Sequence, residues 1–186
     1  MKKLLVSLMA LALMFSICNL AMADTVTYPS RDVQIPATVV IPDGDGPFPM
    51  VVLAHGHGGS KDENIGFGAI ADALKAEGIA SIRMDFPGCG ESTESFQLNT
   101  LTNMKQDVLN AVAYLTSTYA IDTTKVGLFG YSMGGRVALE LLGEGDYPFA
   151  AVALLAPANS TEDLKKLFGG ADNWEALKAT ADANGY

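Results

Sequence analysis

A five-residue segment, Gly130-Tyr131-Ser132-Met133-Gly134, constrains the fold of this chain more than any other feature. It has the pattern Gly-x-Ser-x-Gly and joins an apolar run, residues 126–129, to a helix-like run, residues 136–142. The two glycines allow a strand to turn sharply into a helix without side-chain clashes. The turn exposes the hydroxyl, so we expect Ser132 to be a nucleophile toward a carbonyl carbon. The alternative is a glycine-rich turn that only packs a helix on a sheet.

The sequence contains no histidine after Ser132. A serine nucleophile needs a base to accept its proton, and in this strand–turn–helix arrangement the histidine comes later in the chain. His55 and His57 both precede the serine. We expect neither to be the base, because their loop would have to swing an imidazole toward Ser132. Loss of the base lowers turnover on the order of a million-fold and leaves roughly 10³–10⁴ over water. The chain is therefore expected to be a weak catalyst by itself.

Strand-like and helix-like segments alternate along the chain. The apolar or β-branched runs cover residues 25–28, 33–41, 49–54, 79–86, 126–129 and 150–155. Helical spacing is found at residues 67–74, which Gly78 ends, at residues 101–119, with Asn99 or Thr100 as the cap, and at residues 133–142. This alternation predicts an α/β fold with a mostly parallel sheet.

The first 23 residues have the pattern of a secretory signal peptide. Lys2 and Lys3 precede an apolar run, residues 4–17, that is short for a membrane span. The small-x-small sequence Ala21-Met22-Ala23 then predicts cleavage before Asp24, and an uncleaved membrane anchor is the alternative. We expect a secreted or periplasmic bacterial protein, with no membrane contact after cleavage.

The net charge of the chain excludes one class of partner, and its cysteine content excludes one source of stability. The formal charge of −9 becomes −11 when Lys2 and Lys3 are removed, and so acidic a protein repels nucleic acid. Cleavage also removes Cys18 and leaves Cys89 alone, so an intramolecular disulfide is excluded. Stability must come from a packed core.

A second glycine-rich segment, His55-Gly56-His57-Gly58-Gly59, directly follows the apolar run at residues 49–54. Such a turn can present backbone N–H groups to a developing oxyanion. We expect the amides of His57 and Met133 to form an oxyanion hole. His55 and His57 could instead be metal ligands, but no cluster of cysteines or carboxylates with ligand spacing supports this, so we expect no metal.

The third segment is Asp85-Phe86-Pro87-Gly88-Cys89-Gly90-Glu91-Ser92. Asp85 could be mistaken for a catalytic acid, but a carboxylate at a strand end more often accepts hydrogen bonds from a glycine-rich turn. Cys89 lacks a flanking cation or a helix start that would lower its pKa, and we expect an inert or mildly reactive thiol.

Taken together, these three segments resemble the α/β-hydrolase superfamily, in particular the branch of cinnamoyl/feruloyl esterases, monoacylglycerol lipases and serine aminopeptidase-like hydrolases. The resemblance covers roughly residues 25–157. It implies a three-layer sandwich whose second strand is antiparallel, a Ser132 nucleophile, the His57 and Met133 amides as oxyanion hole, and no cofactor. It also implies an acid and a histidine on loops after two further strands. Asp163, Asp172 and Asp182 follow Ser132, but none lies at a strand end.

The segment after residue 157 looks like the start of a helical cap, with short helices at residues 160–168 and 173–183. No strand follows, so residues 150–155 would be an exposed apolar edge through which the chain could self-associate. We therefore expect a signal peptide at 1–23, the N-terminal part of an α/β-hydrolase domain at 24–157 and a cap or tail at 158–186, with the C-terminal strands missing. The expected function is hydrolysis of small carboxylic esters by an incomplete chain. A protein that binds an acyl or ester ligand without turnover is the alternative.

Overall fold

The computed structural model describes residues 23–145, 148–158, 175–176, 179–180 and 183. The predicted signal peptide at residues 1–23 and the predicted cap or tail at residues 158–186 therefore lie almost entirely outside the described residues. The elements are, in chain order, β1 (Asp24–Ser30), β2 (Val33–Val40), β3 (Phe48–Ala54), α2 (Gly66–Ala76), β4 (Ala80–Met84), a short 3₁₀ helix (Phe96–Leu98), α3 (Leu101–Thr118), β5 (Ile121–Tyr131), α4 (Met133–Glu144) and β6 (Phe149–Leu155).

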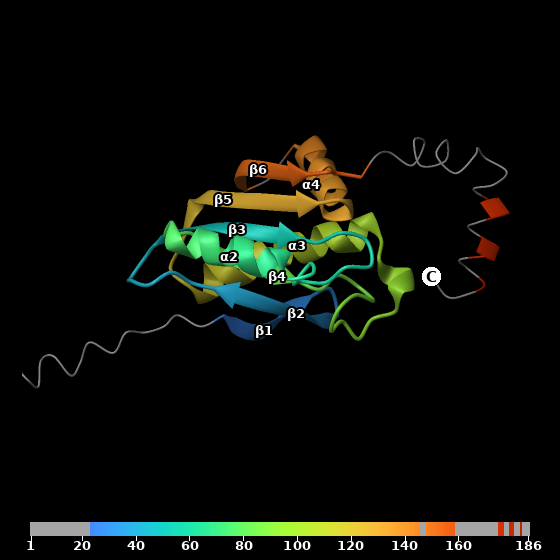
Figure 1. Ribbon diagram of the computed structural model, residues 1–186, viewed down its shortest axis with the longest axis horizontal. Helices are drawn as coiled ribbons and strands as arrows, with labels where there is room; N and C mark the ends of the chain where they lie inside the picture. The colour runs from blue at the N-terminus through green and yellow to red at the C-terminus, as the bar shows by residue number, and fades with distance from the viewer. Residues whose placement is uncertain (1–22, 146–147, 159–174, 177–178, 181–182, 184–186) are drawn as a thin grey trace, which may run out of the picture.

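The six strands form one sheet in the order β1-β2-β4-β3-β5-β6. β2 runs antiparallel to both β1 and β4, whereas β4, β3, β5 and β6 run parallel to one another. The predicted α/β class and mostly parallel sheet are confirmed, and so is the antiparallel second strand. Because the carboxyl ends of the parallel strands meet at one edge, the loops after β3, β4 and β5 come together there (Figure 1).

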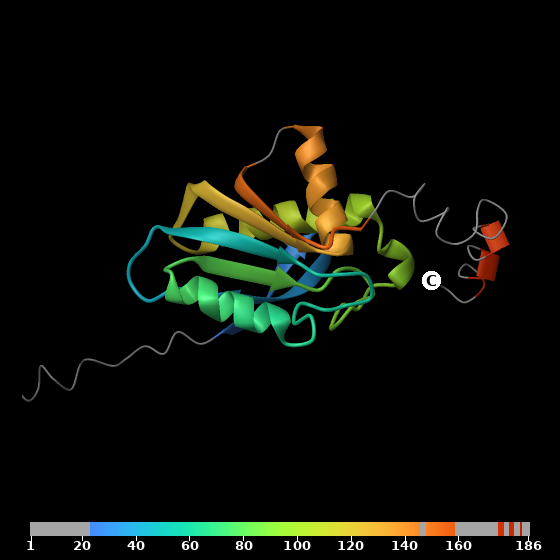
Figure 2. The same cartoon turned by 45° about the horizontal axis from the view of Figure 1, so that its top comes forward.

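Helices cover both faces of this sheet. α2 lies on one face, and α3 and α4 lie on the other, as Figures 1 and 2 show from two directions. The described part is thus a three-layer α/β sandwich. None of the helices in the described ranges is long and apolar enough to cross a membrane.

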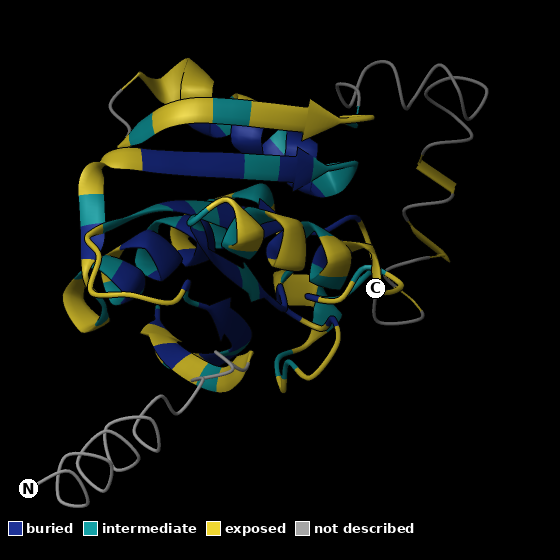
Figure 3. Ribbon diagram, turned by 60° about the vertical axis from the view of Figure 1, so that its left-hand side comes forward, coloured by how far each residue is buried: buried dark blue, intermediate teal, exposed yellow. Residues whose placement is uncertain are grey.

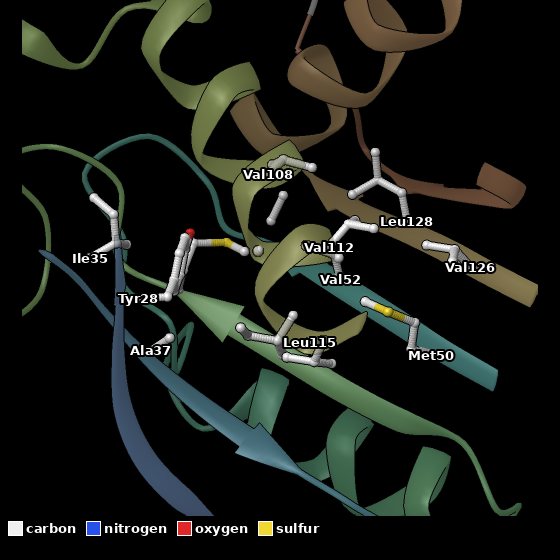
Figure 4. Close-up of a cluster of buried hydrophobic side chains, with 14 of the residues drawn as sticks. Tyr28, Ile35, Ala37, Met50, Val52, Val108, Val112, Leu115, Val126 and Leu128 are labelled. Atoms are coloured by element: carbon white, nitrogen blue, oxygen red, sulfur yellow. The ribbon is translucent and has the colours of Figure 1, made fainter. Parts of the chain in front are cut away.

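The main hydrophobic core lies between α3 and the sheet (Figure 4). Tyr28, Val52, Val108 and Leu115 are fully buried there. A smaller cluster under α2 contains Leu53, Phe67 and Ala71. The buried residues of both helices follow the predicted helical spacing, which confirms the faces that the sequence assigns to the core.

The ends of two helices confirm the predicted signals. The Thr100 hydroxyl accepts a hydrogen bond from the N–H of Asn103 at 3.2 Å, so Thr100 is the N-cap of α3. Gly78 has φ 74° just after α2 and donates its N–H to the carbonyl of Lys75.

The strand bounds differ from the prediction by a few residues, and the differences at β5 and β4 have identifiable causes. β5 extends from residue 121 to 131 instead of 126 to 129, because Ile121 pairs with Phe48 ahead of the apolar run. The intervening residues are polar and exposed, so hydrophobicity does not mark them as strand. β4 ends at Met84 rather than Phe86, because the Asp85 side chain turns into the following loop.

A buried ion-pair network fastens α3 to the turn between β1 and β2. Asp107 is fully buried on α3 and accepts hydrogen bonds from Arg31 Nε at 2.9 Å and from the Ser30 hydroxyl at 2.5 Å. Arg31 also donates to both carboxylate oxygens of Glu94, at 2.6 and 2.7 Å. Burial raises the pKa of Asp107, and the hydrogen bonds from Arg31 and Ser30 oppose that shift.

β6 is the exposed edge of the sheet in the described part of the chain. Figure 3 shows it exposed along most of its length beside a largely buried β5. Leu154 and Leu155 are 38% and 52% exposed. An apolar groove of about 200 Å³ continues this surface toward α2 and is lined by residues such as Ile70, Leu74 and Val152. The predicted exposed edge is confirmed for these residues.

This edge leads to a prediction about association. An unpaired apolar strand is a template for pairing with another chain, and a charge placed on it opposes such pairing. We expect the substitution Ala151→Lys on β6 to lower the apparent mass of the purified chain in light scattering. Ala69→Lys on the exposed side of α2 is the matched control and should leave the mass unchanged. Equal effects of the two lysines would contradict edge pairing.

Candidate active site

Ser132 occupies the turn between β5 and α4 and has an unusual backbone conformation. Its φ is 50° and its ψ is −111°. A non-glycine residue with positive φ is strained and persists only where the surroundings impose it. Here the Ser132 N–H donates to the carbonyl of Leu155 at 3.0 Å, and the Ser132 carbonyl accepts from the N–H groups of Arg136 and Ala158 at 3.1 and 2.8 Å. Backbone on both sides therefore holds the serine on its turn.

The two glycines of the motif are required by close packing. A Cβ placed on Gly130 would overlap the carbonyl oxygen of Gly134, and one placed on Gly134 would overlap the carbonyl oxygen of Ala54. The start of α4 thus lies directly against the end of β3. The predicted sharp turn is confirmed, and its glycines bring the serine to the loop that follows β3.

That loop passes beside the serine. A Cβ on Gly56 would lie 3.1 Å from ring carbons of Tyr131 and 3.4 Å from the Cβ of Ser132. His57 is the next residue, and Met133 is the first residue of α4, whose initial N–H groups have no carbonyl partner within the helix. The helix N-terminus also favours negative charge. The structure therefore brings the segments of His57 and Met133 to the same place beside Ser132, and their role as oxyanion donors stays a prediction.

Sequence reasoning missed Glu63, which supports this loop. Its Oε2 accepts the N–H of Gly56 at 2.9 Å. A Cβ on Gly59 would lie 2.6 Å from the same oxygen, so the carboxylate fills the space beneath the glycines. An acid seven residues after a glycine gives no local signal of this contact.

His55 has a structural role and is not available as a base. Its ring is fully buried, Nε2 accepts the N–H of Phe86 at 3.0 Å, and Nδ1 lies 2.7 Å from the carbonyl oxygen of Gly56. Since Nε2 accepts, the proton of the neutral ring is on Nδ1 and is donated to Gly56. Both nitrogens are therefore occupied. Burial lowers the pKa of His55, against the opposing effect of the Gly56 carbonyl.

The lowered pKa of His55 predicts a loss of stability in mild acid. Below about pH 6.5 the unfolded chain binds a proton at His55 that the folded chain resists, so the free energy of unfolding falls as pH falls. The slope from this one group is at most about 1.4 kcal/mol per pH unit. Urea denaturation between pH 7.5 and 5 should show a shallower slope for His55→Gln than for the unmodified chain. An equal slope in the two proteins would contradict the assignment.

The ring of His57 packs edge-on against Phe96, with centroids 5.1 Å apart. Phe96 belongs to the 3₁₀ helix that follows the third glycine-rich segment. This contact supports the expectation that neither histidine of the sequence serves as general base to Ser132.

Asp85 is structural, as the sequence predicts. Its buried carboxylate accepts the N–H of Lys61 at 2.6 Å and the N–H of Glu91 at 2.9 Å, and it pairs with the Lys61 ammonium at 3.2 Å. A Cβ on Gly90 would overlap this carboxylate, which explains the glycine. Asp85 thus ties the loop after β4 to the loop after β3.

Cys89 is a buried free thiol in the same loop. Burial raises its pKa, while hydrogen bonds from the N–H of Gly58 and from Asn99 partly oppose the shift. This agrees with the expected inert or mildly reactive thiol. In the described ranges no three His, Cys, Asp or Glu side chains form a group that could hold a metal ion. Asp163, Asp172 and Asp182 lie outside the described residues.

Comparison with known families gives one match that covers most of the chain. The family model described as serine aminopeptidase, S33, matches residues 45–180. This range contains all three glycine-rich segments and the whole region around Ser132.

Individual relatives include esterases. The chain is 30% identical over 149 residues to esterase EstD of Thermotoga maritima, which covers 76% of this chain and 35% of that protein. It is 33% identical over 111 residues to the quorum-quenching protein AidA of Acinetobacter baumannii, covering 59% of this chain and 36% of that protein. The chain spans about a third of the length of these curated relatives.

Solved structures agree on the fold. Est1E of Butyrivibrio proteoclasticus, whose structure contains ferulic acid, matches with a TM-score of 0.67 and 21% identity over 77% of this chain and 58% of that chain. An α/β-hydrolase, GrgF from Penicillium, matches with a TM-score of 0.67 and 18% identity over 89% of this chain and 56% of its own. At sequence identities this low, the similarity to these structures shows the fold alone.

Proposed function

Because the chain belongs to the serine aminopeptidase (S33) family of α/β-hydrolases, we propose that it cleaves carboxylic esters through Ser132 as a covalent nucleophile. The observation that carries the proposal is the strained backbone of Ser132, at φ 50°, on a turn that the Gly-x-Ser-x-Gly packing enforces. A serine kept in this conformation has its hydroxyl presented at the edge of the sheet where the loops meet.

The proposed reaction has two steps. Ser132 Oγ attacks the ester carbonyl, its proton passes to a base, and the C–O bond to the alcohol breaks with protonation of the leaving oxygen. Water then attacks the acyl-serine and releases the carboxylic acid. In both steps the N–H groups of His57 and Met133 stabilise the negative charge on the carbonyl oxygen.

Neither histidine of this sequence is proposed as the base. Support comes from the two histidines, because His55 has both ring nitrogens occupied and His57 packs on Phe96. Export through a leader at residues 1–23 is part of the same proposal and rests on the sequence pattern alone.

Hydrolysis of an aryl acetate by the purified chain and by Ser132→Ala tests the proposal. With the nucleophile and oxyanion amides but no base, we expect hydrolysis roughly 10³–10⁴ above water, and on the order of 10⁶-fold below a complete triad. This residual rate should disappear in Ser132→Ala. An equal rate in both proteins would contradict a nucleophilic Ser132.

Binding of an acyl or ester ligand without turnover is the second candidate. The hydrogen bonds of His55 and the packing of His57 on Phe96 favour it, because a site in which neither histidine acts as the base can still bind a ligand. Saturable ligand binding by a chain whose aryl acetate hydrolysis does not depend on Ser132 would support this candidate over catalysis.

A further inference from the structure

A small pocket adjoins the nucleophile turn on the side of α2. Its volume is about 220 Å³, and its apolar walls come from α2, β5 and β6. These walls are Phe67, Ile70, Tyr131 and Leu155. Tyr131 directly precedes Ser132, and the carbonyl of Leu155 accepts the Ser132 N–H. A group attached to a carbonyl at Ser132 therefore has this pocket within reach.

Glu63 gives the pocket a negative charge. Glu63, Asn64 and Gly66 complete its lining. The Glu63 Oε2 accepts the N–H of Gly56 at 2.9 Å, and Oε1 accepts no hydrogen bond from the residues that the structure describes. One carboxylate oxygen is thus fixed by the loop beside Ser132, and the other is free to accept from a ligand.

Neighbouring acids are neutralised by cations, and Glu63 is not. Asp62 pairs with Arg83 at 3.3 Å. Lys61 pairs with both Glu91, at 2.9 Å, and Asp85, at 3.2 Å. Within the described ranges no lysine, arginine or histidine lies within ion-pair distance of Glu63. Its charge therefore acts on whatever enters the pocket.

The backbone holds Glu63 in place. Glu63, Asn64 and Ile65 have consecutive positive φ values of 40°, 51° and 71°. The Glu63 N–H donates to the Ser60 carbonyl, and the Glu63 carbonyl accepts from the Gly66 N–H, both at 3.0 Å. Such a turn is strained at each residue, and these bonds fix the direction in which the carboxylate leaves the backbone.

We propose that this pocket binds an apolar group with a positive charge, such as an alkylammonium or arylalkylammonium group on the substrate near the scissile carbonyl. The apolar walls would contact the hydrocarbon part, and the Glu63 carboxylate would accept a charge-assisted hydrogen bond from the ammonium. Anionic groups of the same shape are repelled. As a statement about substrate choice the inference rests on the proposed function, whereas binding to the pocket does not require Ser132.

Ligand titration of the intact chain, followed by NMR of the backbone amides, tests the pocket directly. The probes are benzylammonium, benzyl alcohol and phenylacetate, which share a ring and differ in charge. We expect benzylammonium to shift the amides of Gly56 and Phe67 and to bind about five- to tenfold more tightly than benzyl alcohol, with no binding of phenylacetate. Equal affinity for the three probes, or tightest binding of phenylacetate, would overturn the proposal.

Two substitutions on one loop distinguish the effect of losing the Glu63 charge from the effect of losing any nearby acid. Glu63→Gln keeps an oxygen that can accept from Gly56, and it should bring the affinity for benzylammonium down to that for benzyl alcohol. Asp62→Asn removes an acid already paired with Arg83 and should keep the preference. Ile70→Trp fills the pocket and should abolish binding of both probes. Unchanged preference in Glu63→Gln, or unchanged binding in Ile70→Trp, would overturn the assignment.

Ser132→Ala distinguishes failure of this inference from failure of the proposed function. The variant should bind benzylammonium as the unmodified chain does, because the pocket lining does not include the serine side chain. Loss of binding in Ser132→Ala would contradict the location of the site. Ser132-dependent hydrolysis in a chain that does not select benzylammonium would leave the nucleophile in place and reject the pocket.

Discussion

Gly134→Ala is expected to disrupt the nucleophile turn, because among the described glycines its added Cβ would lie nearest to another atom. The new Cβ would overlap the carbonyl oxygen of Ala54 and lie 2.7 Å from that of His55. Both contacts are backbone atoms, so they can be relieved only by moving α4 away from the end of β3. Such overpacking typically costs about 1–3 kcal/mol, occasionally more, and we expect the upper end of this range.

The same displacement would separate the amide of Met133 from the loop that carries His57. Loss of one oxyanion donor costs roughly 10²–10³ in rate, so Ser132-dependent hydrolysis should fall below detection. Gly143→Ala is the matched control on the same helix, because no atom lies within 4 Å of its added Cβ. It should stabilise the chain by about 0.5–1 kcal/mol through helix propensity. Urea denaturation of both variants checks the opposite signs, and a neutral Gly134→Ala would contradict the tight packing at the turn.

Asp107→Ala is expected to cause the largest loss of stability from a polar side chain. The substitution removes the acceptor of Arg31 and of the Ser30 hydroxyl at a fully buried position on α3. Breaking a buried ion pair on one side typically costs about 3–5 kcal/mol, because the remaining charge is left without its partner. Glu94 still holds Arg31, which places the expected value at the lower end.

Chemical denaturation measures this effect, with Asp72→Ala on the exposed side of α2 as the control for loss of one acid. Asp72→Ala should change the midpoint little, as most surface substitutions do. The double variant Arg31→Met with Asp107→Leu replaces the pair by apolar groups and should recover part of the loss. Equal midpoints for Asp107→Ala and Asp72→Ala would show that the buried pair does not stabilise α3.

Local sequence patterns predicted the elements that build the site. Two of these patterns act through neighbours a few residues away, namely the apolar spacing of Phe67 and Ala71 and the Thr100 cap. The glycines at 130 and 134 are required because a Cβ would not fit there. Such signals are visible in a single sequence. The polar residues 122–125 of β5 were missed because they lie in an irregular stretch between two pairs with β3, Ile121 with Phe48 and Val126 with Met50, which hydrophobicity does not reveal.

The side chains that support the site depend on long-range contacts. Asp107 meets Arg31 across 76 residues, and His55 meets Phe86 across 31. One signal was available for Asp107, which lies three residues after Met104 on the apolar face of its helix, where an acid needs a buried partner. Glu63 offered none, because its contact with Gly56 follows from a loop with three consecutive positive φ angles.

Covalent labelling with a fluorophosphonate tests the central claim, that Ser132 is a nucleophile on a preorganised turn. The purified chain and Ser132→Ala are incubated with the reagent over hours, and the adduct is located by peptide mass spectrometry. We expect one slow adduct per chain, on Ser132, and none on Ser132→Ala. An adduct on another residue would contradict a nucleophilic Ser132. So would an unmodified Ser132 after a reagent exposure, concentration multiplied by time, about 10⁶-fold larger than a control serine hydrolase needs for complete reaction.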